Sequence, residues 1–138
     1  MADLEAFIAG ELAKPFRWGE TDCCSTAARW VARQTGVDPI AVVGWKYAAA
    51  TTAEAMLSES DLVARMRFAM ARAGFRRTAA AHVGDVGLVT VAIAGARRLT
   101  AGIRTQTGWV ARHEGGFAFV RSALLAWAVA NPTDTRPR

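Results

Sequence analysis

The stretch Phe16-Arg17-Trp18-Gly19-Glu20-Thr21-Asp22-Cys23-Cys24-Ser25 decides the fold, because it leads from a loop into a helix that begins with a thiol. Asp22 is a preferred N-cap residue, and Gly36 is a natural stop. Between them runs an apolar stripe at helical spacing: Ala27, Trp30 and Val31. Cys23 is therefore expected in the first helical turn, where free backbone N–H groups and the helix dipole stabilise a thiolate. This placement suits a nucleophile, and a small buried hydrophobe is the alternative.

Helical patterns fill the first half of the chain and strand patterns the second. Spacing and caps predict helices at Asp3–Lys14, Asp22–Gly36 and Pro39–Gly44, one opening at Thr51, and one at Asp61–Ala73. Strands are expected at Val86–Ile93, Arg98–Thr105, Trp109–His113 and Phe117–Val120, with a last helical turn at Ser122–Trp127. Helices followed by a small antiparallel sheet are typical of an α+β fold.

One predicted helix and two tryptophans indicate which residues form the core. The apolar residues of the helix at Asp61–Ala73 cover much of its surface, which predicts a central helix: Leu62, Val63, Met66, Phe68, Ala69 and Met70. Trp18 and Trp30 flank the cysteines, and large aromatic side chains dominate a core of this size. We expect both tryptophans to be buried and to hold the cysteine segment in place.

The bulk composition indicates one domain. The chain has 138 residues, of which 52% are hydrophobic, and this favours a single domain over residues 1–130. Residues 131–138 are polar with two prolines and are expected to form a flexible tail. No apolar run approaches the ~20 residues that span a bilayer, and the acidic N-terminus does not resemble a signal peptide. We therefore expect neither membrane insertion nor signal-directed export.

The positive charge is scattered rather than concentrated. The formal net charge is +5, and the strongest local pairs are Arg76-Arg77 and Arg97-Arg98. Neither pair is the dense run that marks a nucleic-acid-binding arm, so we expect no nucleic-acid partner. A solvated face is the common role of such residues. An anionic partner, such as a cell wall or an acidic protein surface, stays open.

A cysteine nucleophile needs a base, and the sequence offers two histidines. His82 precedes Gly84-Asp85, and His113 ends a predicted strand. A thiolate is usually activated by an imidazole that a third polar group orients. A zinc site from the two cysteines and two histidines is the alternative, but adjacent cysteines lack the usual ligand gap. We expect no metal and no cofactor.

The cysteine segment resembles the nucleophile motif of the NlpC/P60 branch of the papain-like cysteine peptidases, in which an aromatic residue and a glycine precede Asp-Cys-Ser-Gly at a helix start. By this resemblance Cys23 is the nucleophile and Cys24 replaces the usual serine. Gly84-Asp85-Val86 is similar to the Gly-Asp that opens the first strand of that family. Thr100-Ala101-Gly102-Ile103 resembles the strand that normally reads His-Val-Gly-Ile. The resemblance implies a papain-like NlpC/P60-type domain.

The position of the catalytic histidine marks a departure from that pattern. Thr100 occupies it, and a threonine does not accept a thiol proton near neutral pH. The third polar residue of the family falls near Arg112 and His113. The implied catalytic set is therefore Cys23 with His113 as an unconventional base. We expect no imidazole in contact with Cys23, and an ordinary or raised thiol pKa.

The chain also resembles a phage- and prophage-associated family similar to NlpC/P60. The shared motifs are the Trp-Gly-x-x-Asp-Cys-Cys start, Gly36-Val37-Asp38-Pro39, Gly44-Trp45-Lys46-Tyr47, the Gly-Asp-Val strand and Trp127. This resemblance implies a structural or assembly component of the tail tip, made in the bacterial cytoplasm and built into the virion, with other tail proteins and peptidoglycan as partners. The alternative is a cysteine endopeptidase that cuts peptidoglycan cross-links during phage DNA entry.

Overall fold

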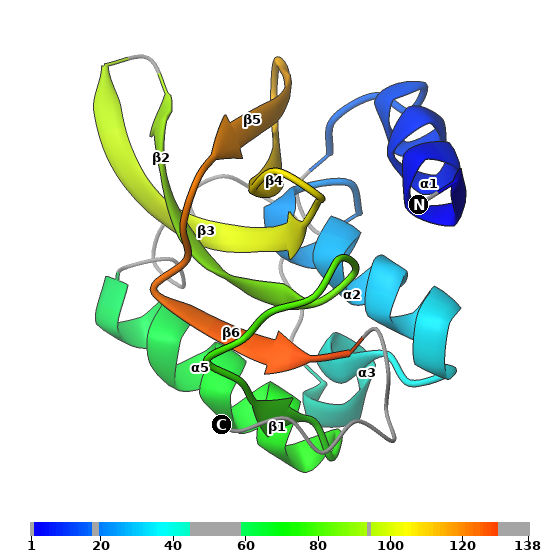
Figure 1. Ribbon diagram of the computed structural model, residues 1–138, viewed down its shortest axis with the longest axis vertical. Helices are drawn as coiled ribbons and strands as arrows, with labels where there is room; N and C mark the ends of the chain where they lie inside the picture. Colours follow the sequence, from blue (N-terminus) through cyan, green and yellow to red (C-terminus); the bar gives the residue numbers. More distant parts are fainter. Residues whose placement is uncertain (1, 18–19, 45–58, 94, 130–138) are drawn as a thin grey trace.

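A computed structural model of the chain describes residues 2–17, 20–44, 59–93 and 95–129. Four helices come first: α1 (Ala2–Leu12), α2 (Cys23–Thr35), α3 (Pro39–Val43) and α5 (Glu59–Arg72). The strands follow as β1 (Arg76–Arg77), β2 (Val86–Ile93), β3 (Ala96–Arg104), β4 (Trp109–His113), β5 (Gly116–Val120) and β6 (Leu125–Ala128). The fold is α+β, as the sequence predicts (Figure 1).

The helix boundaries follow from local capping. Asp22 caps α2, and Gly36 ends it with a φ of 81° that a side chain would disfavour. Asp38 caps α3 by accepting hydrogen bonds from the N–H groups of Ile40 and Ala41, and Gly44 closes it. The predicted helices in these places are confirmed, and α5 begins two residues before its predicted start. The helix predicted from Thr51, the Gly44–Tyr47 motif beyond Gly44, Trp18 and the tail at 131–138 lie outside the described residues.

The strands form one six-stranded sheet in the order β1-β6-β2-β3-β4-β5, with antiparallel neighbours throughout. The β2–β3 hairpin is its centre, running from Val86↔Ile103 to Ile93↔Ala96. The predicted strands at Val86–Ile93 and Trp109–His113 are confirmed at their bounds. Figure 1 shows the sheet curling, so that β5 returns toward β2.

The end of the chain corrects one prediction. Residues Ser122–Trp127 were expected to form a helical turn, but β6 is a strand that pairs with both β2 and β1. Its side chains alternate between the two faces of the sheet, because Ala126 and Trp127 belong to different cores. Pairing with β2 outweighs the weak local preference of these residues. Strand β1, which the sequence did not predict, exists through the same pairing.

Two apolar cores lie on opposite faces of the sheet. The larger joins the helices to the sheet and includes Phe7, Trp30, Leu62, Leu88, Ile103 and Trp127. The smaller lies on the other face and contains Val89, Val91, Trp109, Ala111 and Ala126. Gly87 is required there, because an added Cβ would lie 2.4 Å from the carbonyl oxygen of Leu125. The helices thus cover one face of the sheet, which fixes the face against which Cys23 packs.

Helix α5 is amphipathic rather than central. Its side chains Leu62, Met66, Ala69 and Met70 are buried, as expected, but Phe68 is 58% exposed. One stripe of α5 therefore packs on the core, and the other faces solvent. No helix in the described ranges is long and apolar enough to span a bilayer.

Candidate functional site

Cys23 lies in the first turn of α2, as predicted. The carboxylate of Asp22 accepts a hydrogen bond from Ser25 N at 3.0 Å and another from Ser25 Oγ at 3.1 Å. This capping fixes where the helix begins and leaves the thiol near the positive end of the helix dipole. Helix α2 packs on β3, so the thiol faces the sheet. A helix start packed on a sheet is the placement that a nucleophilic cysteine needs.

The two vicinal thiols interact with each other. Their sulfur atoms are 3.8 Å apart, and both side chains are buried. Either thiol can donate across this distance, and donation from Cys24 is the largest influence that lowers the pKa of Cys23. Burial and the charge of Asp22 raise the pKa of Cys23, whereas the Thr100 hydroxyl and the Ala101 backbone lower it. The net direction is downward.

The pKa of Cys24 moves the opposite way, well above its ordinary value, through its bond to Cys23 and through burial. The pKa directions of the two thiols are therefore opposite, and the pair titrates as a unit rather than as two independent groups. Our expectation of an ordinary or raised pKa for Cys23 is wrong. That expectation did not include Cys24 as a donor to the Cys23 thiolate.

Thr100, not a histidine, contributes a side chain to the surroundings of the thiol. Its hydroxyl is among the groups that lower the pKa of Cys23. The position that the resemblance assigns to the catalytic histidine therefore does lie beside Cys23. A hydroxyl there can donate a hydrogen bond to a thiolate, but it does not take the thiol proton near neutral pH.

The two histidines occupy other places. His113 pairs with Gly116 at the far end of β4, and its Nδ1 accepts a hydrogen bond from Gly115 N at 3.1 Å. His82 is exposed, and its backbone N–H donates to the Asp85 carboxylate at 2.8 Å. In the part of the chain that the structure describes, neither imidazole is among the groups that shift the pKa of Cys23. The pairing of Cys23 with His113 stays a hypothesis.

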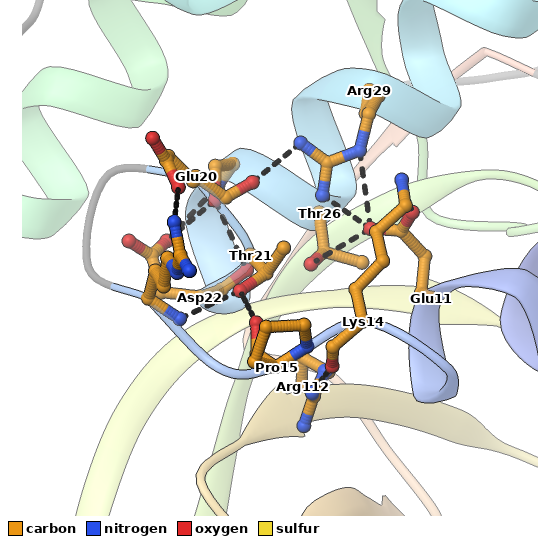
Figure 2. A network of polar contacts seen from close by, with 11 residues as sticks. Glu11, Lys14, Pro15, Glu20, Thr21, Asp22, Thr26, Arg29 and Arg112 are labelled. Atoms are coloured by element: carbon orange, nitrogen blue, oxygen red, sulfur yellow. Dashed lines mark hydrogen bonds and ion pairs between the residues drawn. The ribbon is translucent and has the colours of Figure 1, made fainter.

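A buried carboxylate ties α1 to α2 beside the cysteine segment. Glu11 is 2% exposed and forms ion pairs with Arg29 and with Lys14, the latter at 2.6 Å (Figure 2). Burial raises the pKa of Glu11, but hydrogen bonds from Arg29 and Lys14 outweigh it, so the pKa is lowered. Arg29 also donates to the carbonyl of Glu20, in the turn just before Asp22. This cluster therefore joins two helices to the turn that leads into Cys23.

The loop before Cys23 is held from the other side by Thr21 and Arg112. Thr21 Oγ1 donates to the carbonyl of Pro15 at 2.7 Å and accepts from Arg17 N at 2.7 Å (Figure 2). Arg112 reaches from β4 to donate to the Lys14 carbonyl at 3.1 Å. Its guanidinium also lies 5.6 Å from the ring centre of Phe16. Arg112 thus positions the loop through backbone and aromatic contacts rather than through an ion pair.

A second buried carboxylate, that of Asp85, lies where β2 begins and β6 ends. Asp85 accepts hydrogen bonds from Val129 N and His82 N, both at 2.8 Å. The indole of Trp30 donates to the Gly84 carbonyl at 2.7 Å, and its ring lies 5.2 Å from that of Phe7. The Gly84-Asp85 pair therefore joins α2, the start of β2 and the end of β6. The predicted burial of Trp30 is confirmed, at 1% exposure.

The space beside the thiols is small and apolar. A cavity of about 40 Å³ lies between Cys24 and the side chains of α5, with Leu62, Met66 and Ala101 among its lining residues. This volume can hold a water molecule or two, but it is too small for a peptide. Within the described ranges no three His, Cys, Asp or Glu side chains gather as metal ligands. The chemistry of the site therefore rests on the Cys23–Cys24 pair and Thr100.

Sequence reasoning missed the residues that position the thiol. Glu11 falls on the same helical face as Leu4 and Phe7, and this spacing was a signal that its carboxylate is buried. Arg29 carries no comparable signal, because its partner lies 18 residues away on another helix.

The fold and this site define a class: an α+β protein with a thiol pair at the start of a helix that packs on an antiparallel sheet. The sequence model of a domain of unknown function (DUF6950) matches residues 1–129. The chain belongs to the DUF6950 family. No curated protein and no solved structure matches it.

Proposed function

We propose that this chain is an NlpC/P60-like domain of the papain-like type whose thiol catalysis is impaired, and that it serves as a structural or assembly component of a phage or prophage tail tip. The resemblance of the Trp-Gly-x-x-Asp-Cys-Cys start and of the Gly-Asp-Val strand supports this assignment. The position of Cys23 at a helix start packed on an antiparallel sheet is compatible with it. In this proposal the partners are other tail proteins, and the protein reaches the virion by assembly in the cytoplasm.

The observation that carries the proposal is the identity of the group beside the thiol. The resemblance expects an imidazole there, and the chain has the Thr100 hydroxyl. Without a base that accepts the thiol proton and later protonates the leaving amine, peptide cleavage loses a large part of its rate. The Thr100 hydroxyl can donate a hydrogen bond to the thiolate, but it cannot take the thiol proton and pass it to the leaving amine. The fold is retained while the proton transfer is lost.

A second candidate is a cysteine endopeptidase that cuts peptidoglycan cross-links. The lowered pKa of Cys23 favours it, because a thiolate stabilised by Cys24 does not need a base to become a nucleophile. Cys23 Sγ would attack the scissile carbonyl, and His113 or water would protonate the departing amine. For this candidate His113 must leave its hydrogen bond with Gly115 and approach the thiol.

Incubation of purified protein with peptidoglycan fragments separates the two candidates. We expect little or no release of peptides, and the same low level from Cys23→Ala and His113→Ala. A phage that carries Cys23→Ala should still assemble infectious particles. Robust cleavage that disappears in both variants would establish the endopeptidase activity and contradict the proposed non-catalytic role. A particle assembly defect in a phage that lacks this protein, restored by the Cys23→Ala chain, tests the tail component directly.

A further inference from the structure

We propose that a hollow between the end of α5 and strand β1 is a docking site for an acidic segment of a partner protein. The hollow has a volume of about 400 Å³. Arg67 and Ala71 of α5, Gly74 and Phe75 of the following turn, Arg76 and Arg77 of β1, and Trp127 of β6 line it. We call it the arginine hollow. None of its lining residues belongs to the cysteine site, so the inference does not rest on the function proposed above.

Among the described residues, no carboxylate lines the arginine hollow. Arg67 lines it from α5, and Arg76 and Arg77 line it from β1. In the same part of the chain the ion pairs use Lys14, Arg17, Arg29 and Arg33, and no side-chain hydrogen bond or ion pair engages the three arginines of the hollow. Like charges gathered at one place repel each other, so an anion bound among them is stabilised.

The negative end of the α5 dipole offsets part of this repulsion. That effect fades within the last helical turn, which ends at Arg72. Arg76 and Arg77 lie beyond it, on the strand. The dipole therefore accounts for a basic residue in the last turn of α5, but it does not account for two adjacent arginines on β1.

The exposed edge of strand β1 indicates that the ligand is an extended peptide. It is the terminal strand of the described sheet, and Thr78 N donates to the Ala126 carbonyl at 3.0 Å in the β1–β6 register. In an antiparallel ladder the hydrogen-bonded pairs alternate, so the N–H and C=O of Arg77 point away from β6. An extended peptide can pair with these groups, as in strand addition to a sheet edge.

Side-chain chemistry favours carboxylates on that peptide. Guanidinium groups bind carboxylates through two parallel hydrogen bonds, and Phe75 and Trp127 add apolar surface for the aliphatic parts of glutamate side chains. A nucleic acid would instead need basic residues spaced along a track of phosphates. The three arginines line a single hollow rather than an extended track, which fits a short acidic segment better than a phosphate backbone.

Fluorescence anisotropy with a labelled hexaglutamate peptide tests the proposal on the full chain. Arg76→Gln/Arg77→Gln should weaken binding by about tenfold or more, because each charge-assisted contact contributes of this order. The matched control is Arg97→Gln/Arg98→Gln, which removes the same charge from two adjacent exposed arginines of β3. We expect less than about a twofold change there. Equal losses in the two double variants would overturn the proposal, because they would indicate a response to net charge alone.

A second pair of variants tests the same hollow from α5. Arg67→Gln should weaken peptide binding, whereas Arg72→Gln should not, because Arg72 lies outside the hollow and over the ring of Phe68 at 5.9 Å. All six substituted arginines are exposed, so circular dichroism should show folded proteins. Failure of the wild-type chain to bind the peptide overturns the proposal. So does tighter, Arg76- and Arg77-dependent binding of an oligothymidylate of equal charge, or equal binding of inorganic phosphate.

Discussion

The segment that leads into Cys23 and strand β3 beside the thiol contribute different kinds of polar group to the site. The segment is held by the buried Glu11 cluster, by Thr21 and by the guanidinium of Arg112. Strand β3 brings the Thr100 hydroxyl and the Ala101 backbone to the same sulfur. The buried polar groups of the segment therefore fix the position of Cys23, and β3 supplies groups that lower the pKa of its thiol. An intact support around a thiol is not a measure of catalytic power.

Among the substitutions considered, loss of Trp30 is expected to lower the free energy of unfolding most. Its ring is buried against Phe7, and its indole N–H holds the Gly84 carbonyl. Trp30→Ala removes a large buried aromatic and leaves that carbonyl unpaired, which should cost roughly 3–5 kcal/mol of unfolding free energy. Urea denaturation measures it. Phe68→Ala is the control, because that ring is mostly exposed and its loss should change stability little. Equal stability of Trp30→Ala and wild type would contradict the placement of α2.

The elements of the fold differ in how far the sequence could predict them. Caps such as Asp22 and Asp38 act within one helical turn, so α2 and α3 could be located from local sequence alone. Strands β1 and β6 are short and depend on partners elsewhere in the chain, such as Arg77↔Trp127 and Gly87↔Ala126. Local propensity does not carry that information, which is why one was predicted as a helical turn and the other was missed.

The site divides in the same way. The position of Cys23 follows from its cap and could be predicted. The direction in which the pKa of Cys23 shifts depends on the 3.8 Å separation of the two sulfur atoms and on the Thr100 hydroxyl. Both depend on how α2 packs on the sheet, which the sequence alone does not give. Glu11 and Arg29 come together only when α1 packs on α2.

The ion pairs of Glu11 with Arg29 and Lys14 should make the stability of the protein depend on pH. Glutamine at position 11 keeps the shape and one acceptor but removes the charge that Arg29 and Lys14 bind. Because Arg29 is about one-third exposed, we expect Glu11→Gln to cost only about 1–3 kcal/mol at neutral pH. The folded pKa of Glu11 is below its ordinary value of 4.5, so its contribution is present above that pH and is lost as pH falls through the folded pKa.

Urea denaturation of both proteins at neutral and acidic pH measures this contribution. The stability difference between wild type and Glu11→Gln should shrink as the pH falls below about 4. Asp3→Asn is the comparison, because Asp3 bonds Arg33 and Gln34 with its side chain about half exposed and should contribute less. A difference that does not change with pH would mean that glutamine harms packing rather than charge pairing.

The thiol centre is expected to show the smallest effects, and Cys24 offers the sharpest test of it. Cys24→Ala removes the donor that most lowers the pKa of Cys23, so that pKa should rise. Cys24→Ser keeps a donor at the same place, as the usual serine of NlpC/P60-like motifs would, and should keep the pKa near its wild-type value. Thr100→Val removes a weaker donor and should raise the pKa by less than Cys24→Ala does.

The pH dependence of iodoacetamide alkylation reports these shifts, because the thiolate is the form that reacts. Fragment-ion mass spectrometry assigns the label to Cys23 or Cys24, and Cys23→Ala supplies the background. If Cys24→Ala leaves the alkylation midpoint unchanged, the vicinal thiol is a packing residue, and the Cys23 thiolate is stabilised by the helix start, Thr100 and the Ala101 backbone instead. If instead Thr100→Val gives the larger shift, β3 contributes more to the thiolate than the helix start does. The strand would then be the better place to introduce a histidine beside the thiol.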